Sequence, residues 1–184
     1  ASASMGRWLR PDTASFTSAP YLVAKPSQLQ LLRQRYKKTY GGRPLIGLSW
    51  CSHRIGVGPH KSTDLVNNWR PIFEVQPDAV FISLQYGARS EVDSNIAAAS
   101  QAFPNITIVR DPHVDTNNDI EAVAAQVAAL DIVVSVSNTT VHLAGALGVP
   151  VWTLVPLGPS RLWYWLNRQP DSLWYPSMRL AWQE

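Results

Sequence analysis

Residues 130–153 read LDIVVSVSNTTVHLAGALGVPVWT, which predicts a buried strand, a polar turn and a closely packed helix. The segment Ile132–Val136 is rich in β-branched apolar residues, a pattern typical of a parallel strand that helices cover on both faces. Small residues after the turn, Gly145, Ala146 and Gly148, allow the next helix to lie close to the sheet. Since ligands of such sheets bind beyond the carboxyl ends of the strands, the turn is a candidate binding site.

The turn carries the groups that a phosphate needs. The N–H groups at the start of a helix and its positive dipole end favour an anion. We therefore expect Ser137, Asn138, Thr139 and Thr140 to contact a nucleotide diphosphate, with His142 one turn further along the helix. The simpler alternative is that these residues only cap the helix, and that His142 is a partly buried structural histidine.

Length and composition favour one soluble domain. The chain has 184 residues, of which 46% are hydrophobic, enough for one substantial core but not for two full-sized α/β domains. A net charge of +3 with scattered basic residues indicates a mild preference for anionic ligands and argues against nucleic acid. The single cysteine, Cys51, excludes an internal disulfide and favours a reducing, cytoplasmic location. No apolar run approaches the roughly twenty residues of a membrane span, and we expect none.

Strand and helix patterns alternate along most of the chain. Residues 1–25 are expected to form an irregular linker or the tail of a preceding domain, and residues 26–184 a single domain. Ser27 is the expected cap of a first amphipathic helix that ends at Gly41 and Gly42. Strands are predicted at 44–50, 79–84, 106–109, 131–136, 149–154 and 178–182, and helices at 64–75, 91–102, 118–129 and 140–147. This alternation predicts an α/β, Rossmann-like parallel sheet with helices on both faces.

The loop after the first strand, SWCSHRIGVGPHKS (49–62), is a second candidate site. Lys61 is the expected phosphate contact and Ser49 the expected hydroxyl contact, whereas Cys51 is expected to be a packing residue. Two glycines that permit close backbone approach and further basic residues lie between them, at Gly56, Gly58, His53, Arg54 and His60. The spacing matches neither a P-loop nor the dinucleotide fingerprint, and the alternative is a solvated loop without a ligand.

Three further groups of residues have both a functional and a structural interpretation. Gln85, at the end of the strand FISLQ, can contact a base or ribose, or it can satisfy the backbone of its own loop. Three aspartates, Asp111, Asp115 and Asp119, match no Ca²⁺ loop; we expect no metal site, and we expect Asn118 or Asp119 to cap the next helix. Aromatic residues near the C-terminus are expected to pack the domain or an interface rather than to bind sugar: Trp163, Tyr164, Trp165, Trp174 and Tyr175.

Several of these segments together resemble a known family. They are SVSNTTVHLAGALGVPVWTLVP (135–156), SLWYPSMRL (172–180), PLIGLSW (44–50) and FISLQYG (81–87). The chain is similar, over roughly residues 20–184, to the C-terminal half of glycosyltransferase family 9-like proteins, relatives of the ADP-heptose:lipopolysaccharide heptosyltransferases. The strongest similarity is to the members that follow tetratricopeptide repeats in bacterial proteins.

The resemblance implies a GT-B architecture, in which two Rossmann-like domains enclose the active site. The chain is then the C-terminal domain, which holds the nucleotide-sugar donor, and it is expected to be a piece of a longer protein. The reaction would be an inverting, metal-independent sugar transfer without a further cofactor. Because the base and the acceptor contacts come largely from the N-terminal domain, we expect this domain alone to bind donor but scarcely to turn over. The resemblance assigns donor contacts to Ser49, Trp50, Lys61, Gln85, Ser137, Asn138, Thr139, Thr140 and His142.

Two other functions compete with this one. The family commonly has an acidic residue at the positions of Ser137 and Gln85, and the lack of charge here favours a degenerate module that acts as a protein-interaction platform through its Trp-rich surface. An NAD-dependent oxidoreductase domain is disfavoured, because no strand is followed by the G-x-G-x-x-G fingerprint.

Overall fold

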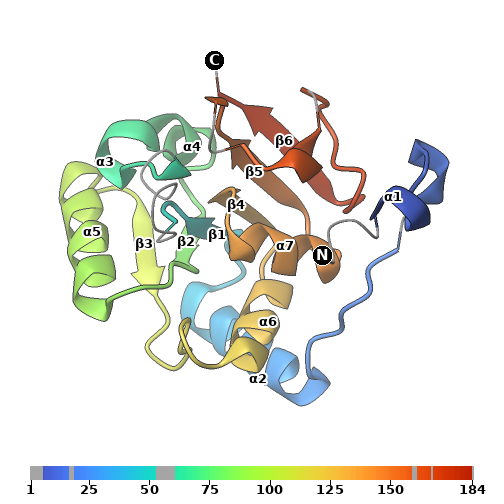
Figure 1. Cartoon of the computed structure of the whole chain (residues 1–184). Helices are drawn as coiled ribbons and strands as arrows, with labels where there is room; N and C mark the ends of the chain where they lie inside the picture. The colour runs from blue at the N-terminus through green and yellow to red at the C-terminus, as the bar shows by residue number, and fades with distance from the viewer. Residues whose placement is uncertain (1–5, 17–18, 53–60, 159–160, 167, 184) are drawn as a thin grey trace.

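A six-stranded, entirely parallel sheet forms the centre of the chain (Figure 1). The computed structural model describes residues 6–16, 19–52, 61–158, 161–166 and 168–183. The strands are β1 (Leu45–Ser49), β2 (Val80–Ser83), β3 (Thr107–Arg110), β4 (Ile132–Val136), β5 (Val151–Val155) and β6 (Met178–Trp182), in the spatial order β3-β2-β1-β4-β5-β6. The predicted Rossmann-like sheet is confirmed, and the last predicted strand extends it beyond β5.

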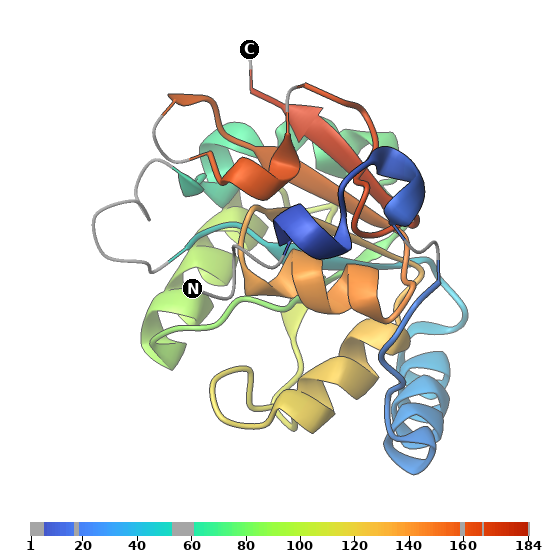
Figure 2. The ribbon, with the colours of Figure 1, turned by 45° about the vertical axis from the view of Figure 1, so that its right-hand side comes forward.

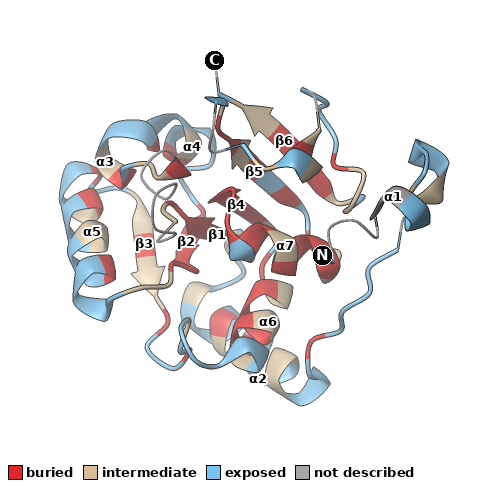
Figure 3. Cartoon of the chain, in the orientation of Figure 1, coloured by how far each residue is buried: buried red, intermediate tan, exposed pale blue. Residues whose placement is uncertain are grey.

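Helices cover the sheet on both faces (Figure 3). Successive residues of a strand point to opposite faces, so a strand with consecutive apolar residues has an apolar surface on each side to bury. Along β4, for example, Val133 packs in one apolar cluster and Val134 in the other. The first cluster includes residues of α2 (Pro26–Tyr40), α6 (Ile120–Ala128) and α7 (Thr139–Ala146). The second includes residues of α3 (Leu65–Asn68), α4 (Arg70–Val75) and α5 (Arg89–Ala102). Among the described helices, none is long and apolar enough to cross a bilayer.

Two local predictions about helices were wrong. The helix predicted over 64–75 is divided into α3 and α4 at Trp69, because Pro71 has no N–H and its ring would clash with the carbonyl of residue 67 in a continuous helix. Ser27 is not a cap, since α2 begins one residue earlier with Lys25 as N-cap and Pro26 at the first helical position. The expected cap of α6 is confirmed at Asp119, whose side chain accepts a hydrogen bond from Ala122 N at 2.9 Å.

The N-terminal segment has more structure than the irregular linker that we expected. It contains α1 (Gly6–Leu9) and a short 3₁₀ turn (Thr13–Ser15), and it then runs past α7 (Figure 2). The N–H groups of Tyr21 and Leu22 both donate to the carbonyl of Ala146 at 3.0 Å. These bonds satisfy a carbonyl in the last turn of α7, so the segment stabilises the end of that helix. The domain boundary at residue 25 stays a prediction.

Gly145 provides a test of how closely α7 approaches its neighbours. A Cβ at this position would lie 2.4 Å from Cγ and 2.7 Å from Cβ of Tyr175, atoms at the base of a buried side chain. Helix propensity alone predicts that Gly145→Ala stabilises the fold by about 1 kcal/mol. We expect the opposite, a loss of about 1–3 kcal/mol in the free energy of unfolding, measured by urea denaturation. In a Tyr175→Ala background the same change should be stabilising; a gain in the otherwise unchanged chain would contradict the close contact.

Candidate functional site

The carboxyl ends of β1, β2 and β4 bring three of the expected donor contacts together. Asn138 Nδ2 donates to Ser49 Oγ at 2.8 Å, and Ser49 Oγ donates to Gln85 Oε1 at 3.0 Å. All three side chains are buried. The same Gln85 oxygen accepts the backbone N–H groups of Trp50 and Cys51, both at 3.0 Å. The network joins the ends of three strands, and Gln85 satisfies backbone groups of the loop after β1. Gln85 Nε2 also donates to Tyr86 O at 2.8 Å, so the residue satisfies the backbone of its own loop as well, as the structural interpretation of Gln85 expects.

Asn138 is also the N-cap of α7. Its Oδ1 accepts a hydrogen bond from Thr140 N at 2.9 Å and therefore satisfies one of the N–H groups that a helix start leaves without an acceptor. Thr139, the first residue of the helix, is exposed, and with Thr140 it lines a cavity of about 130 Å³. The start of α7 is thus partly capped from within and partly open at the ligand-binding edge of the sheet.

His142 lies among aromatic side chains rather than at an open surface. Its Nε2 is 3.0 Å from Tyr164 Oη, its Nδ1 is 3.2 Å from Tyr175 Oη, and its ring stacks on Trp165 at 5.2 Å between centroids. Burial, and secondarily the positive charge of Lys61, lower the pKa of His142 to about 4. The imidazole is therefore neutral near pH 7, and it can orient a neighbour through hydrogen bonds but supplies no positive charge there.

The expected packing role of the C-terminal aromatic residues is confirmed for those nearest to α7. Trp165 is 1% exposed, and its Nε1 donates to Ser137 Oγ at 2.8 Å. Ser137 is itself buried, so its hydroxyl faces the protein interior. Trp163 is 59% exposed, although its ring contacts that of Trp174 edge to face.

Lys61 and Thr139 line different cavities. Lys61 is only 5% exposed and belongs to the wall of a cavity of about 330 Å³ at the carboxyl ends of β4, β5 and β6. The described residues that line this cavity do not include Ser49, Gln85 or Asn138. Lys61 nevertheless lies close enough to His142 to lower its pKa. The residues His53, Arg54, Gly56, Gly58 and His60, expected to form the same loop site, lie outside the described part of the chain.

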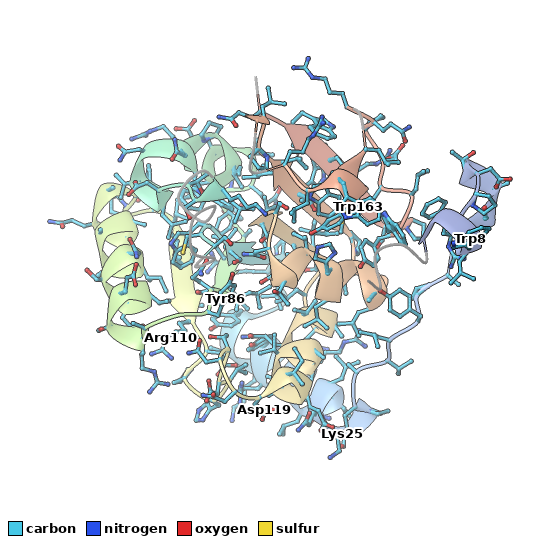
Figure 4. All side chains as sticks on the ribbon, in the orientation of Figure 1. Trp8, Lys25, Tyr86, Arg110, Asp119 and Trp163 are labelled. Carbon is cyan, nitrogen blue, oxygen red and sulfur yellow. The ribbon has the colours of Figure 1, made fainter. Side chains whose placement is uncertain are left out.

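A third cavity, of about 350 Å³, lies at the carboxyl ends of β2 and β3 and was missed in the sequence. Gln85 and Arg110 contribute to its lining, and Arg110 is labelled in Figure 4. Two of its lining residues are joined, since the side chain of Asn117 exchanges two hydrogen bonds with the backbone of Gly87, at 2.8 and 3.0 Å. The available signal was position. The two segments that line the cavity, one after β2 and one after β3, directly follow strands at the edge where ligands of parallel sheets bind.

Neither the cysteine nor the aspartates form a reactive cluster. Burial, and then the negative charge of Glu91, raise the pKa of the Cys51 thiol to about 11, which disfavours the nucleophilic thiolate. Asp111 is buried and bonded to Arg35 and to Tyr36 Oη, so it holds α2 to the end of β3. Within the described ranges, no group of three or more His, Cys, Asp or Glu residues is arranged to hold a metal ion.

Comparison with known proteins identifies one sequence relative and several structural ones. No protein-family model matches the chain. Protein FlbA of Caulobacter vibrioides is 31% identical over 172 residues, which cover 93% of this chain but only 27% of FlbA. The chain therefore spans about a quarter of that relative.

Several solved structures with the same fold are glycosyltransferases. A family 9 glycosyl transferase from Veillonella parvula is 10% identical, with a TM-score of 0.55 over 92% of this chain and 44% of its own. The ADP-heptose lps heptosyltransferase II of E. coli is 14% identical, with a TM-score of 0.53 over 88% and 45%. E. coli heptosyltransferase WaaC, solved with ADP, is 18% identical, with a TM-score of 0.52 over 83% and 42%. The sheet and its helices thus have the fold of somewhat less than half of each of these proteins.

Proposed function

We propose, from the fold shared with family 9 glycosyltransferases, that this chain is the donor-binding domain of a GT-B glycosyltransferase. It would be the C-terminal half of the GT-B pair, and its ligand a nucleotide-diphosphate sugar. The proposal includes a longer protein, in which an N-terminal GT-B domain supplies the base and the acceptor contacts and tetratricopeptide repeats precede it. It also includes a cytoplasmic location and transfer with inversion, without a metal ion or a further cofactor.

One observation supports this function most directly: the start of α7 lines a cavity that adjoins a larger one along the ligand edge of the sheet. The cavity at Thr139 and the cavity of about 350 Å³ share the segment Thr116–Asn118. Pockets for small ligands begin at about 300 Å³, so the larger cavity can take a nucleoside. We therefore place the diphosphate at Thr139 and Thr140 and the nucleoside between the ends of β2 and β3.

In this arrangement the chain stabilises the departing nucleoside diphosphate. The N–H groups and positive dipole end of α7 offset negative charge that develops on the leaving group. Lys61 adds a positive charge near His142. Its burial would strengthen its attraction to the diphosphate, because water screens a buried charge less. Preorganised donors of this kind are worth about 3–4 kcal/mol each in enzymes where one has been removed. Neutral His142 would orient the phosphates or the sugar.

A second candidate function is the protein-interaction platform. It is favoured because the polar residues of the expected donor site form hydrogen bonds within the protein. Ser49, Gln85 and Asn138 are buried and bonded to one another or to the backbone, which a purely structural network also requires. Large apolar side chains are exposed on and beside the N-terminal segment, at Trp8, Leu9, Tyr21, Leu22, Val23 and Trp163. In that case nucleotides would leave the thermal stability of the chain unchanged, whereas a partner protein would raise it.

Calorimetric titration with ADP, UDP and GDP tests the donor site. We expect saturable binding of at least one of them, and ADP heads the panel because the E. coli relative is solved with it. Thr139→Ala and Lys61→Met should each weaken that binding about tenfold or more, the effect of losing one hydrogen bond to a charged group.

Two exposed residues of α2 provide matched controls, Thr39→Ala and Lys38→Met. Both should leave the affinity unchanged. If no nucleotide binds, the donor-site proposal is wrong and the platform remains; if the control variants weaken binding as strongly, the ligand is not at the start of α7.

A further inference from the structure

The side chain of Gln85 is committed within the protein, although it lines the cavity where we place the nucleoside. Its Oε1 accepts hydrogen bonds from Ser49 Oγ, Trp50 N and Cys51 N. Its Nε2 donates to Tyr86 O at 2.8 Å and to Cys51 O at 3.3 Å. The residue is 1% exposed, and an amide with two acceptor sites and two donor hydrogens has none left for a ligand. A ribose in this cavity therefore needs another partner.

A carboxylate is the natural partner of a ribose, because it accepts strong hydrogen bonds and the sugar hydroxyls can donate them. In Rossmann-like domains that bind dinucleotides, an Asp or Glu commonly has this role. Three aspartates follow β3. Asp111 is buried and bonded to α2, and Asp119, labelled in Figure 4, caps α6. The third, Asp115, is the only acidic residue among the described ones that line the cavity of about 350 Å³.

The carboxylate of Asp115 is held in place and still offers an acceptor site. Its Oδ1 accepts from Asn117 N and Asn118 N, at 2.9 and 3.2 Å, and its Oδ2 accepts from Asn118 Nδ2 at 2.9 Å. A carboxylate has about four acceptor sites, so one on Oδ2 remains. The Asn118 side chain, and then the N–H of Asn117, lower the pKa of Asp115, which keeps it ionised near pH 7. The residue is exposed, so a ligand can reach it.

Asp115 also lies where the proposed arrangement puts the ribose. The ribose connects the diphosphate to the base, and the two cavities in which we place these groups share Thr116–Asn118. Asp115 directly precedes this shared segment and lines only the larger cavity. The segment is tied to the end of β2, since Thr116 Oγ1 donates to Gln85 O at 3.0 Å. The carboxylate is thus positioned before a ligand binds.

We propose that Asp115 is a specificity-determining residue, which accepts a hydrogen bond from the 2′- or 3′-hydroxyl of the nucleotide's ribose. The inference rests on the donor site proposed above and narrows its ligand to ribonucleoside diphosphates, as opposed to their deoxy forms. Gln85 then supports the loop after β1 and does not contact the nucleotide through its side chain.

Calorimetric titration with paired nucleotides tests this role of Asp115. ADP, UDP and GDP are each compared with their 2′,3′-dideoxy analogues, in the unchanged chain and in Asp115→Asn. The unchanged chain should bind the ribose form of its tightest nucleotide at least about tenfold more strongly than the dideoxy form, the effect of a hydrogen bond to a charged group. The amide of Asp115→Asn keeps Oδ1 for the two backbone N–H groups but removes the charged acceptor. The preference should therefore fall to about threefold or less.

The ratio of the two affinities separates a direct contact from changes in loop shape or net charge. A less ordered loop, or the loss of one negative charge near the diphosphate, changes the affinity for both forms alike and leaves their ratio unchanged. The matched control is Asp78→Asn, which makes the same change of charge at an exposed residue before β2 and outside the cavity. Its preference for the ribose form should equal that of the unchanged chain.

Three results would overturn the role of Asp115 while leaving the donor site in place. They are equal affinity for the ribose and dideoxy forms in the unchanged chain, a preference that Asp115→Asn keeps in full, and a preference that Asp78→Asn lowers as strongly. In each of them nucleotide still binds. If none of the three nucleotides binds in either form, the donor-site proposal fails, and the role of Asp115 fails with it.

Discussion

Replacing Trp165 with alanine should lower the free energy of unfolding by about 3–5 kcal/mol, as expected for the loss of a fully buried tryptophan. Its side chain is among the largest fully buried ones in the described part of the chain, and it stacks on His142 with an angle of 7° between the rings. Its Nε1 is also the donor to Ser137 Oγ. Truncation therefore removes core packing and leaves a buried hydroxyl without this partner at the candidate diphosphate turn.

Urea denaturation of three variants separates these contributions. Trp163→Ala, two residues away and largely exposed, should cost no more than about 1 kcal/mol. Trp165→Phe keeps an aromatic ring but not the N–H, so its loss in the free energy of unfolding should lie between those of Trp163→Ala and Trp165→Ala. If Trp165→Ala is no worse than Trp163→Ala, the segment after β5 does not pack against α7 as described.

Lowering the pH from about 6.5 toward 4 should destabilise the chain by up to about 3 kcal/mol through His142 alone. Burial and the charge of Lys61 lower the pKa of this imidazole to about 4, from the ordinary histidine value of 6.5. Above pH 6.5 the group is neutral in both states. Below it the unfolded chain takes up the proton first, so the folded state loses stability until the pH reaches the folded pKa.

The control for this prediction is His142→Gln, whose amide can keep a hydrogen bond to Tyr164 or Tyr175 but does not titrate. Urea denaturation at several pH values between 4 and 7.5 should give a steeper fall in stability for the unchanged chain than for the variant. Other histidines and the carboxylates titrate in both proteins and cancel in the difference. Equal slopes would show that His142 is not held in its neutral form.

The fold could be predicted to a large extent because its signals are local. Apolar β-branched runs, polar turns and small residues repeat along the chain, and each strand was found within one or two residues of its predicted place. The cap of α6 could be narrowed to Asn118 or Asp119, of which Asp119 is the cap, because a cap acts within three residues. The break between α3 and α4 was missed although its signal, Pro71, is local too.

The candidate site was only partly predictable. Position after a strand correctly indicated that Ser49, Gln85 and Asn138 meet at one edge of the sheet. It could not show that they bond to one another, because Ser49 and Asn138 are 89 positions apart and their hydrogen bond depends on the order of the strands. For the same reason Lys61 and Thr139, both expected to contact phosphate, were not recognised as lining separate cavities.

The alternation of strands and helices, the burial of β4 and the polar turn before α7 could all be predicted from the order of the residues alone. These follow from the periodicity of apolar residues and from capping, which act over a few positions. The assembled sheet and helices were needed to show which polar groups bond within the protein and which face a cavity. A hydrogen bond depends on distance and direction between atoms, and for residues far apart in the chain both are set by how the sheet is assembled.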